Sequence, residues 1–330
     1  MSLITFTERG LYCAKADVYI DPWKPVNRAL ITHGHSDHAR FGHKKYLATH
    51  NAIPVIKYRL GNIKITGTHY GEEWDINGVK ISFHPAGHII GSAQIRVAYK
   101  GEVWVISGDY KIEDDGICQP FESVNCTHFV TECTFGLPIF NWENQDKVVK
   151  EINEWWQESK DAGKTCIISA YALGKAQRVI QNLDASLGKV YTHGAIENTN
   201  QVLRQQGFPI KETVLVVDDF GSSDFIGNMV VAPPSALGSS WMKRFKNVTT
   251  ASVSGWMAMR GTRRRRATDR GFVLSDHADW KGLNGAIKSS GAEKIYVTHG
   301  YTDIFSKWLQ SQGLDAEVVT TEFANEEGIE

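Results

Sequence analysis

A short segment crowded with metal-binding side chains constrains the fold of this chain more than any other feature. From His33 to His38 it places three imidazoles and a carboxylate within six residues. The apolar run from Ala29 to Ile31 precedes it and is typical of a buried strand, so the cluster is expected where that strand ends. Side chains alternate along an extended segment, and His33, His35 and Asp37 are therefore expected to face the same way. His38 falls where the chain can turn into a helix and join Asp37 at a second metal.

The types of ligand indicate the metal. Imidazole and carboxylate groups without a thiolate favour zinc, while manganese and iron accept the same ligands. The spacing predicts two adjacent sites, with His33 and His35 at the first metal and Asp37 and His38 at the second. The alternative is a polar strand-to-helix turn that is rich in histidine by chance, and the density of the cluster argues against it.

The order His-x-His-x-Asp-His resembles the signature of the metallo-β-lactamase superfamily, and further motifs of that superfamily follow along the chain. The resemblance implies that His88 is the third ligand of the first metal and that Asp109 bridges both metals. It assigns His299 to the second metal. Upstream, Asp21 matches the strand-end aspartate that orients the ligand loop through hydrogen bonds, a support that metal-bound histidines usually require.

Two more motifs, Thr131 to Gly136 and Ser275 to Asp279, resemble those of the β-CASP nucleases, the branch of the superfamily that cuts nucleic acids. This resemblance implies that Glu132 supports His277, which protonates the leaving oxygen. It also bears on the substrate, because a histidine at the position of His299 is typical of RNA-processing members. The eukaryotic DNA-repair members usually carry an apolar residue there.

The resemblance is narrower still to bacterial proteins described as ligase-associated DNA exonucleases. It is carried by the stretches Tyr19 to His38, Pro233 to Phe245 and Val253 to Trp280. It implies a DNA substrate, a role in DNA repair or end processing, and an association with DNA ligases and helicases. Similar sequences have also been described as messenger-RNA 3′-processing factors, so an RNA substrate remains the alternative.

The distribution of the ligands predicts a discontinuous catalytic domain. From Gln145 the chain alternates between helical and strand patterns, which is typical of a parallel sheet covered by helices, with Trp155 and Trp156 in its core. Because expected ligands lie on both sides of this segment, we place an inserted α/β domain at residues 141–254. Residues 1–140 and 255–330 then form the catalytic domain. The family resemblance implies an αββα sandwich for the catalytic domain and a β-CASP cap for the insertion.

Three features of the sequence are candidates for binding the phosphates of a substrate. Lys175 follows a glycine at an expected helix start, where backbone N–H groups can hold an anion. Ser235 follows a strand and two prolines, although this segment also fits a stiff turn. The dense basic run eleven residues before His277 is interpreted as a contact to the phosphate backbone rather than as a solvated face. Its members are Arg263, Arg264, Arg265 and Arg266.

Composition limits the other classes of function. The formal net charge is −1, so any attraction for nucleic acid has to come from local basic patches. The five cysteines include no C-x-x-C pair, which argues against a disulfide framework and a thiolate zinc site. Reduced cysteines and the lack of a long apolar run predict a cytoplasmic protein that does not contact membranes.

The leading functional hypothesis is a metal-dependent DNA exonuclease. Two metals bridged by Asp109 would activate a water for attack on the phosphodiester, with Asp37 in the metal centre and His277 as the general acid held by Glu132. An RNA-processing nuclease of the same fold is the second hypothesis. A small-molecule metallohydrolase is the third, and the Glu132–His277 pair and the cap argue against it. A non-catalytic scaffold is the fourth, although every expected ligand is present.

Overall fold

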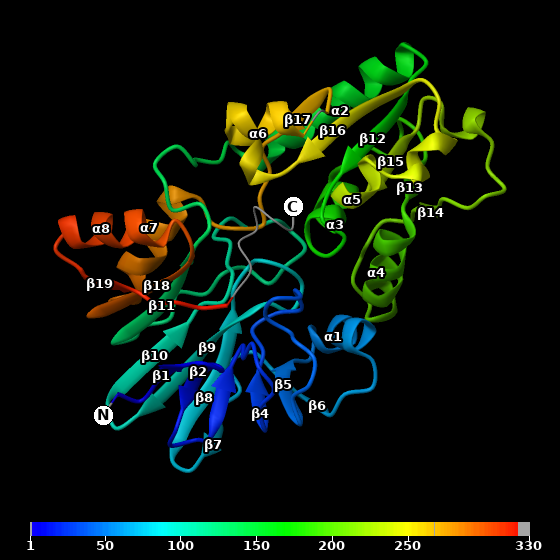
Figure 1. The fold of residues 1–330 in the computed structure, drawn as a ribbon. Helices are drawn as coiled ribbons and strands as arrows, with labels where there is room; N and C mark the ends of the chain where they lie inside the picture. Colours follow the sequence, from blue (N-terminus) through cyan, green and yellow to red (C-terminus); the bar gives the residue numbers. More distant parts are fainter. Residues whose placement is uncertain (1, 267, 323–330) are drawn as a thin grey trace. The chain divides into compact units, whose positions relative to one another are not determined.

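The computed structural model describes residues 2–266 and 268–322. These residues form two compact units, one from Trp142 to Asp276 and the other from the chain on both sides of it (Figure 1). The sequence placed the end of the inserted segment at residue 254, but the compact unit continues to Asp276. The reason is strand β17 (Arg270–Phe272), which pairs in parallel with β16 (Val248–Val253) and completes the sheet of this unit.

The first unit contains two sheets. The first sheet has the strand order β1-β2-β3-β4-β5-β6, and β3 to β6 pair in parallel. Its strands are β1 (Thr5–Thr7), β2 (Gly10–Cys13), β3 (Val18–Ile20), β4 (Arg28–Leu30), β5 (Lys45–Thr49) and β6 (Ile65–Thr68). The second sheet has the order β19-β18-β11-β10-β9-β8-β7. Its strands are β7 (Trp74–Ile76), β8 (Val79–Pro85), β9 (Ala93–Tyr99), β10 (Glu102–Ile106), β11 (His128–Cys133), β18 (Lys294–Gly300) and β19 (Asp315–Val318).

Apolar residues from both sheets form the largest core of the first unit. Ile20 and Leu30 from the first sheet pack in one cluster with Phe83 and Trp104 from the second. Helix α1 (Ile53–Leu60) packs through Ile56 on other residues of the first sheet. Helices α7 (Trp280–Ser290) and α8 (Thr302–Ser311) pack on residues of β10, β11 and β18.

The second unit is built on a sheet of six strands in the order β14-β13-β15-β12-β16-β17. Every pairing within it is parallel, as the alternation of helical and strand patterns predicted. The remaining strands are β12 (Thr165–Ser169), β13 (Val190–Thr192), β14 (Val214–Leu215) and β15 (Met229–Ala232). The α-helices are α2 (Gln145–Asp161), α3 (Lys175–Asn182), α4 (Gly194–Gln205), α5 (Pro234–Leu237) and α6 (Arg260–Arg265), and the 3-10 turns are η1 (Ser222–Phe225), η2 (Ser240–Arg244) and η3 (Gly255–Ala258).

The core of the second unit confirms the prediction for the two tryptophans of α2. Trp155 and Trp156 lie in the main apolar cluster of this unit, and Trp156 has no exposed surface. Helix α2 begins with Asn144, whose side chain accepts a hydrogen bond from the backbone N–H of Asp146. Among the described residues, no helix is long and apolar enough to cross a membrane.

Candidate metal centre

The loop that follows β4 carries four of the expected ligands and departs from the expected local structure. The segment from His33 to His38 is a series of bends and turns, neither an extended strand nor the start of a helix. The backbone N–H of Ala39 donates to the carbonyl of His35 at 2.9 Å, which closes this turn. The side chains therefore do not follow the alternation of a strand, and the loop directs them into two groups.

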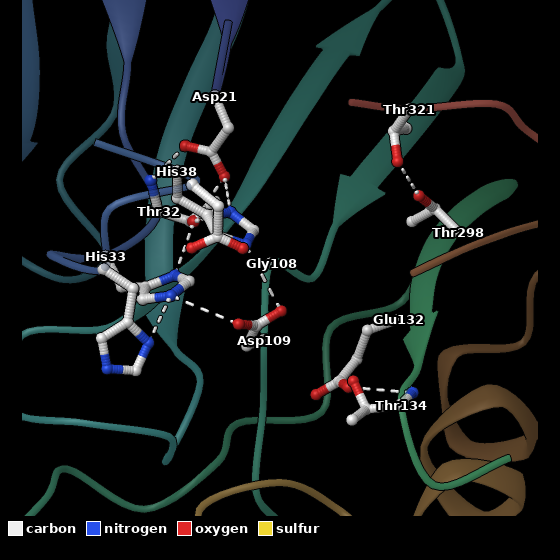
Figure 2. Close-up of polar contacts among 12 residues, drawn as sticks. Asp21, Thr32, His33, His38, Gly108, Asp109, Glu132, Thr134, Thr298 and Thr321 are labelled. Carbon is white, nitrogen blue, oxygen red and sulfur yellow. Dashed lines mark hydrogen bonds and ion pairs between the residues drawn. The ribbon is translucent and has the colours of Figure 1, made fainter. Parts of the chain in front are cut away.

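Asp21 holds this loop from the end of β3 (Figure 2). Its Oδ1 accepts the backbone N–H of Thr32 at 2.8 Å, and its Oδ2 accepts the hydroxyl of Thr32 at 2.5 Å. Oδ2 also lies 2.8 Å from Nδ1 of His38. Asp21 itself has a positive φ of 41°, an uncommon conformation that carries strain for a residue with a Cβ.

These contacts select the ring nitrogens that face the metal centre. Nδ1 of His38 donates to Asp21, and Nδ1 of His33 lies 3.0 Å from the Thr32 hydroxyl, whose proton goes to Asp21. In both rings the proton is thereby placed on Nδ1. Nε2 then carries the lone pair that a metal requires.

The first group of ligands consists of His33, His35, His88 and Asp109, whose ligand atoms lie within 4.8 Å of one another. Nδ1 of His35 is 3.2 Å from Nε2 of His33 and 3.1 Å from Nε2 of His88. Nε2 of His33 is 3.3 Å from Oδ2 of Asp109. A tetrahedron of ligands around zinc, with bonds of about 2.0–2.1 Å, has edges of roughly 3.3 Å. The side chains are thus spaced as the ligands of one small metal ion.

The second group consists of Asp37, His38 and His299. Nε2 of His38 lies 3.5 Å from Oδ2 of Asp37 and 3.5 Å from Oδ1 of Asp109. Asp109 therefore directs one oxygen to each group, as expected of a bridging ligand. Its buried Oδ1 accepts no hydrogen bond from the part of the chain that the structure describes. A buried carboxylate oxygen without a donor is costly, and a cation between the two groups removes this cost, so the residues fit two ions.

Glycines allow the ligand loops to approach one another. Gly108, directly before Asp109, has a φ of +56°, and a Cβ at this position would lie 2.7 Å from the side chain of Thr32. Gly300, directly after His299, has a φ of +105°, and a Cβ there would lie 2.3 Å from the carbonyl oxygen of Cys133. Close backbone approach of this kind is a role that only glycine fills without strain.

The charges of the cluster respond to burial and to the neighbouring groups. Burial lowers the pKa of His33 to about 4 and the pKa of His88 well below its ordinary value. Burial also disfavours the charged form of His38, but the surrounding carboxylates, Asp109 first, outweigh it and raise the pKa of His38 well above its ordinary value. His33 and His88 are therefore neutral near pH 7, which is the form that binds metals.

Glu132 and His277 form a buried pair beside the bridging carboxylate. Nδ1 of His277 lies 2.8 Å from Oε1 and 2.9 Å from Oε2 of Glu132, and each side chain is about 2% exposed. Glu132 is held in turn by the backbone N–H groups of Tyr110 and Thr134, at 2.9 and 3.3 Å. The ring of His277 lies 4.6 Å from the ring of His88, centroid to centroid. This arrangement keeps Nδ1 protonated and directs the other ring nitrogen away from Glu132.

The residues that the sequence proposed for phosphate binding all lie in the second unit. Ser235 is exposed at the start of α5, and the arginines of the basic run lie at the end of α6, with Arg263, Arg264 and Arg265 exposed. Lys175 differs from the expectation, because its side chain is buried and its ammonium lies 3.9 Å from Oδ2 of Asp276. The aromatic ring of Tyr171 lies 5.1 Å from the same ammonium. An ammonium held in this way is not presented to solvent as a phosphate site.

Two residues of the centre were missed in the sequence. Thr32 links Asp21 to His33, and its position directly before the first histidine at the end of a strand was the available signal. Arg40 donates from Nε to the carbonyl of Asp37 at 3.0 Å and from Nη1 to the carbonyl of Trp23 at 3.3 Å. Nothing in the spacing of the motif indicated that Arg40 holds the ligand loop.

An Asp21→Asn variant tests the support of the ligand loop. The amide preserves the shape of the side chain but removes the oxygen that accepts from His38 and Thr32, so the affinity for metal is expected to fall by about 10- to 100-fold. Titration against a chromogenic chelator measures this affinity. Asp75→Asn, at an exposed carboxylate of β7, is the matched control. Equal metal affinity for both variants would contradict the assigned role of Asp21.

Comparison with known proteins finds relatives that are named as a DNA ligase, an RNase and a cleavage and polyadenylation factor. No family model matches the chain. It is 27% identical over 327 residues to a probable DNA ligase of Opitutus terrae, which covers 97% of this chain and 31% of the ligase. It is 32% identical over 117 residues to the RNase aCSPSF2 of Saccharolobus solfataricus, covering 34% of this chain and 23% of that protein. It is 28% identical over 123 residues to the cleavage and polyadenylation specificity factor 73 of Drosophila melanogaster, covering 37% and 18%.

The chain thus spans about a third or less of the length of these relatives. Among solved structures, a protein of unknown function from Enterococcus faecalis shares the fold, with a TM-score of 0.60, 8% identity, and coverage of 90% of this chain and 80% of that one. The sequence motifs, the two ligand groups and these relatives agree. The chain is a homologue of the β-CASP nucleases of the metallo-β-lactamase superfamily.

Proposed function

We propose that this protein is a metal-dependent nuclease that hydrolyses phosphodiester bonds. In this proposal the first unit is the αββα sandwich of the metallo-β-lactamase fold, and the unit from Trp142 to Asp276 is the β-CASP cap. One observation carries the proposal. Two groups of ligands share the carboxylate of Asp109, and the buried Glu132–His277 pair lies beside that same carboxylate.

The donor set supports two divalent ions, with zinc as the preferred metal and manganese as the alternative, because every ligand is an imidazole or a carboxylate. His33, His35 and His88 would hold the first ion, Asp37, His38 and His299 the second, and Asp109 both. Ions bound there would lower the pKa of a water and offset the charge that develops on the phosphate.

The protein's own groups account for the departure of the leaving group. His277 has one ring nitrogen committed to Glu132, so its other nitrogen can carry a proton to the departing sugar oxygen. The carboxylate of Glu132 fixes the orientation of the imidazole and stabilises its charged form. Two backbone N–H groups hold Glu132, which keeps the pair aligned in the absence of substrate.

DNA is the favoured substrate, and exonucleolytic cleavage is the favoured mode. The support is the alignment with the probable DNA ligase, which extends over 97% of this chain. The same alignment supports a partnership with a DNA ligase. RNA is the second candidate, because the relatives named as an RNase and as a cleavage and polyadenylation factor match the chain over 34% and 37% of its length.

Matched single-stranded DNA and RNA oligonucleotides, labelled separately at the 5′ and 3′ ends, test this proposal. The metal-loaded protein is expected to shorten DNA stepwise from one end and to spare RNA, and an Asp37→Ala variant is expected to cut neither. Preferential cleavage of RNA would show that the substrate is RNA rather than DNA. Absence of cleavage of both substrates, in the presence of zinc or manganese, would contradict the nuclease proposal.

A further inference from the structure

A second concave site lies in the first unit and contains none of the metal ligands. It is a cavity of about 350 Å³ beside β3 and the loop that leads into β4. Its volume is at the lower end of the range of small-ligand sites, which begins at about 300 Å³. The residues that line it include Arg9, Asp17, Arg28, Gly42 and Lys44.

Three cationic side chains converge on this cavity. Arg9, Arg28 and Lys44 are exposed, and none of them forms an ion pair with a carboxylate of the described residues. Nη1 of Arg28 donates to the carbonyl of Ala16 at 3.3 Å, and Nη1 of Arg9 lies 3.5 Å from the carbonyl of Pro25. These backbone contacts hold the two guanidinium groups at the cavity and leave most of their N–H donors for another acceptor.

The charge balance of the cavity favours an anion. Asp17 is its one acidic residue, and the hydroxyl of Tyr12 donates to that carboxylate at 3.0 Å. The cavity thus has three cationic side chains and one anionic side chain, although the net charge of the whole chain is −1. Elsewhere in the same unit, the exposed ammonium of Lys80 is paired with Glu73 and Asp75, at 3.2 Å each. Unpaired guanidinium and ammonium groups gathered in a concave surface match the charge and the oxygen geometry of a phosphate.

A residue with an exposed aromatic ring directly precedes one of the residues that line this cavity. Phe41 is 72% exposed, the largest fraction among the large apolar side chains of the described residues. It precedes Gly42, which lines the cavity, and it follows Arg40, which is hydrogen-bonded to the carbonyl of Asp37. An aromatic ring next to a basic concavity is the combination with which proteins hold single-stranded nucleic acid, the ring stacking on a base and the cations contacting phosphates.

We propose that this cavity binds a phosphate of a single-stranded part of the substrate and that Phe41 stacks on a neighbouring base. This inference rests on the proposed nuclease function and adds a substrate-binding site outside the metal centre. The loop from His38 to Lys44 connects the two sites, because it begins at a metal ligand and ends at a cation of the cavity. A nucleic-acid strand that is bound at the cavity would therefore be retained on the protein while it is cut.

The test compares two doubly substituted proteins with equal loss of charge. Arg28→Ala/Lys44→Ala removes two cations of the cavity, and Lys45→Ala/Lys64→Ala removes two exposed cations of the same unit that do not line it. Affinity for a fluorescent single-stranded oligonucleotide is measured at several salt concentrations. Both variants carry His277→Ala and are loaded with metal, so that cleavage does not interfere. Each lost phosphate contact is expected to reduce the slope of log affinity against log salt by about 0.7.

Because the cavity is proposed to hold one phosphate, the cavity variant is expected to bind the oligonucleotide with a slope that is less steep by about 0.7, and the control variant with an unchanged slope. Without the His277 substitution, the cavity variant is expected to raise KM for the oligonucleotide and to hydrolyse bis(p-nitrophenyl) phosphate at the wild-type rate. Phe41→Ala is expected to weaken oligonucleotide binding by roughly 5- to 100-fold, while Phe41→Trp retains it.

Three outcomes would overturn this inference. The first is that Arg28→Ala/Lys44→Ala leaves the affinity and the salt slope unchanged, although the wild-type protein binds and cuts the oligonucleotide. The second is an equal effect of the control variant, which would indicate a diffuse charge effect. The third is a cavity variant that no longer binds adenosine monophosphate, although the wild type does, and that keeps its affinity for the oligonucleotide. This result would assign the cavity to a free nucleotide. Failure of the nuclease proposal is distinguished from these outcomes, because wild-type protein would then cut no oligonucleotide.

Discussion

A His277→Ala variant is expected to keep its metal content and to lose turnover on oligonucleotides by roughly a hundred- to ten-thousand-fold. The ring of His277 lies 4.6 Å from the ring of His88, and its Nδ1 is bound to Glu132, so its other nitrogen is available to donate a proton. Removal of the imidazole leaves the departing oxygen without its acid. Single-turnover rates, with metal content measured on the same sample, give the result.

Two further variants make this test specific. His50→Ala removes an exposed histidine of the first unit and is expected to retain the full rate. Glu132→Gln keeps an oxygen that accepts from Nδ1 of His277 but removes the negative charge that stabilises the imidazolium, so a smaller loss is expected than for His277→Ala. Wild-type turnover in His277→Ala, or loss of metal in that variant, would contradict the role of general acid.

An Asp109→Ala variant is expected to lose both metal and activity. Its two oxygens reach the two ligand groups separately, at 3.3 Å from Nε2 of His33 and at 3.5 Å from Nε2 of His38, so one substitution removes a ligand from each group. The expected loss of metal affinity exceeds the 10- to 100-fold typical of residues that only support a ligand. A metal ion contributes several kcal/mol to the stabilisation of the transition state, so activity is expected to fall by at least about a thousandfold.

Metal content after dialysis and the rise of the melting temperature on addition of zinc measure this effect. The wild-type protein is expected to gain stability with zinc, because an ion that binds only the folded state shifts the unfolding equilibrium. Asp109→Ala is expected to gain much less, and Asp75→Asn, at an exposed carboxylate, is expected to behave as the wild type. Two ions per chain in Asp109→Ala would show that this carboxylate is not the bridge.

Much of the fold could be predicted from periodicity. Strand–helix alternation after Gln145 identified a parallel sheet, because strands buried on both faces are short runs of apolar residues separated by amphipathic helices. The end of that unit could not be located in the same way. Strand β17 is three residues long and contains a glycine, and only its pairing with β16 assigns it to the sheet. A short edge strand has little local signal of its own.

For the metal centre, the sequence alone identified the candidate ligands, because imidazole and carboxylate groups in a dense motif indicate a chemistry whatever the backbone does. The link that Thr32 makes between Asp21 and His33, the ring nitrogen that His38 directs to Asp21, and the burial of Lys175 against Asp276 were decided only by the tertiary structure. The physical reason is that these features depend on contacts between segments far apart in the chain. Residue type and spacing record the donors that a chain offers, whereas the partner of each donor depends on which segments the fold brings together.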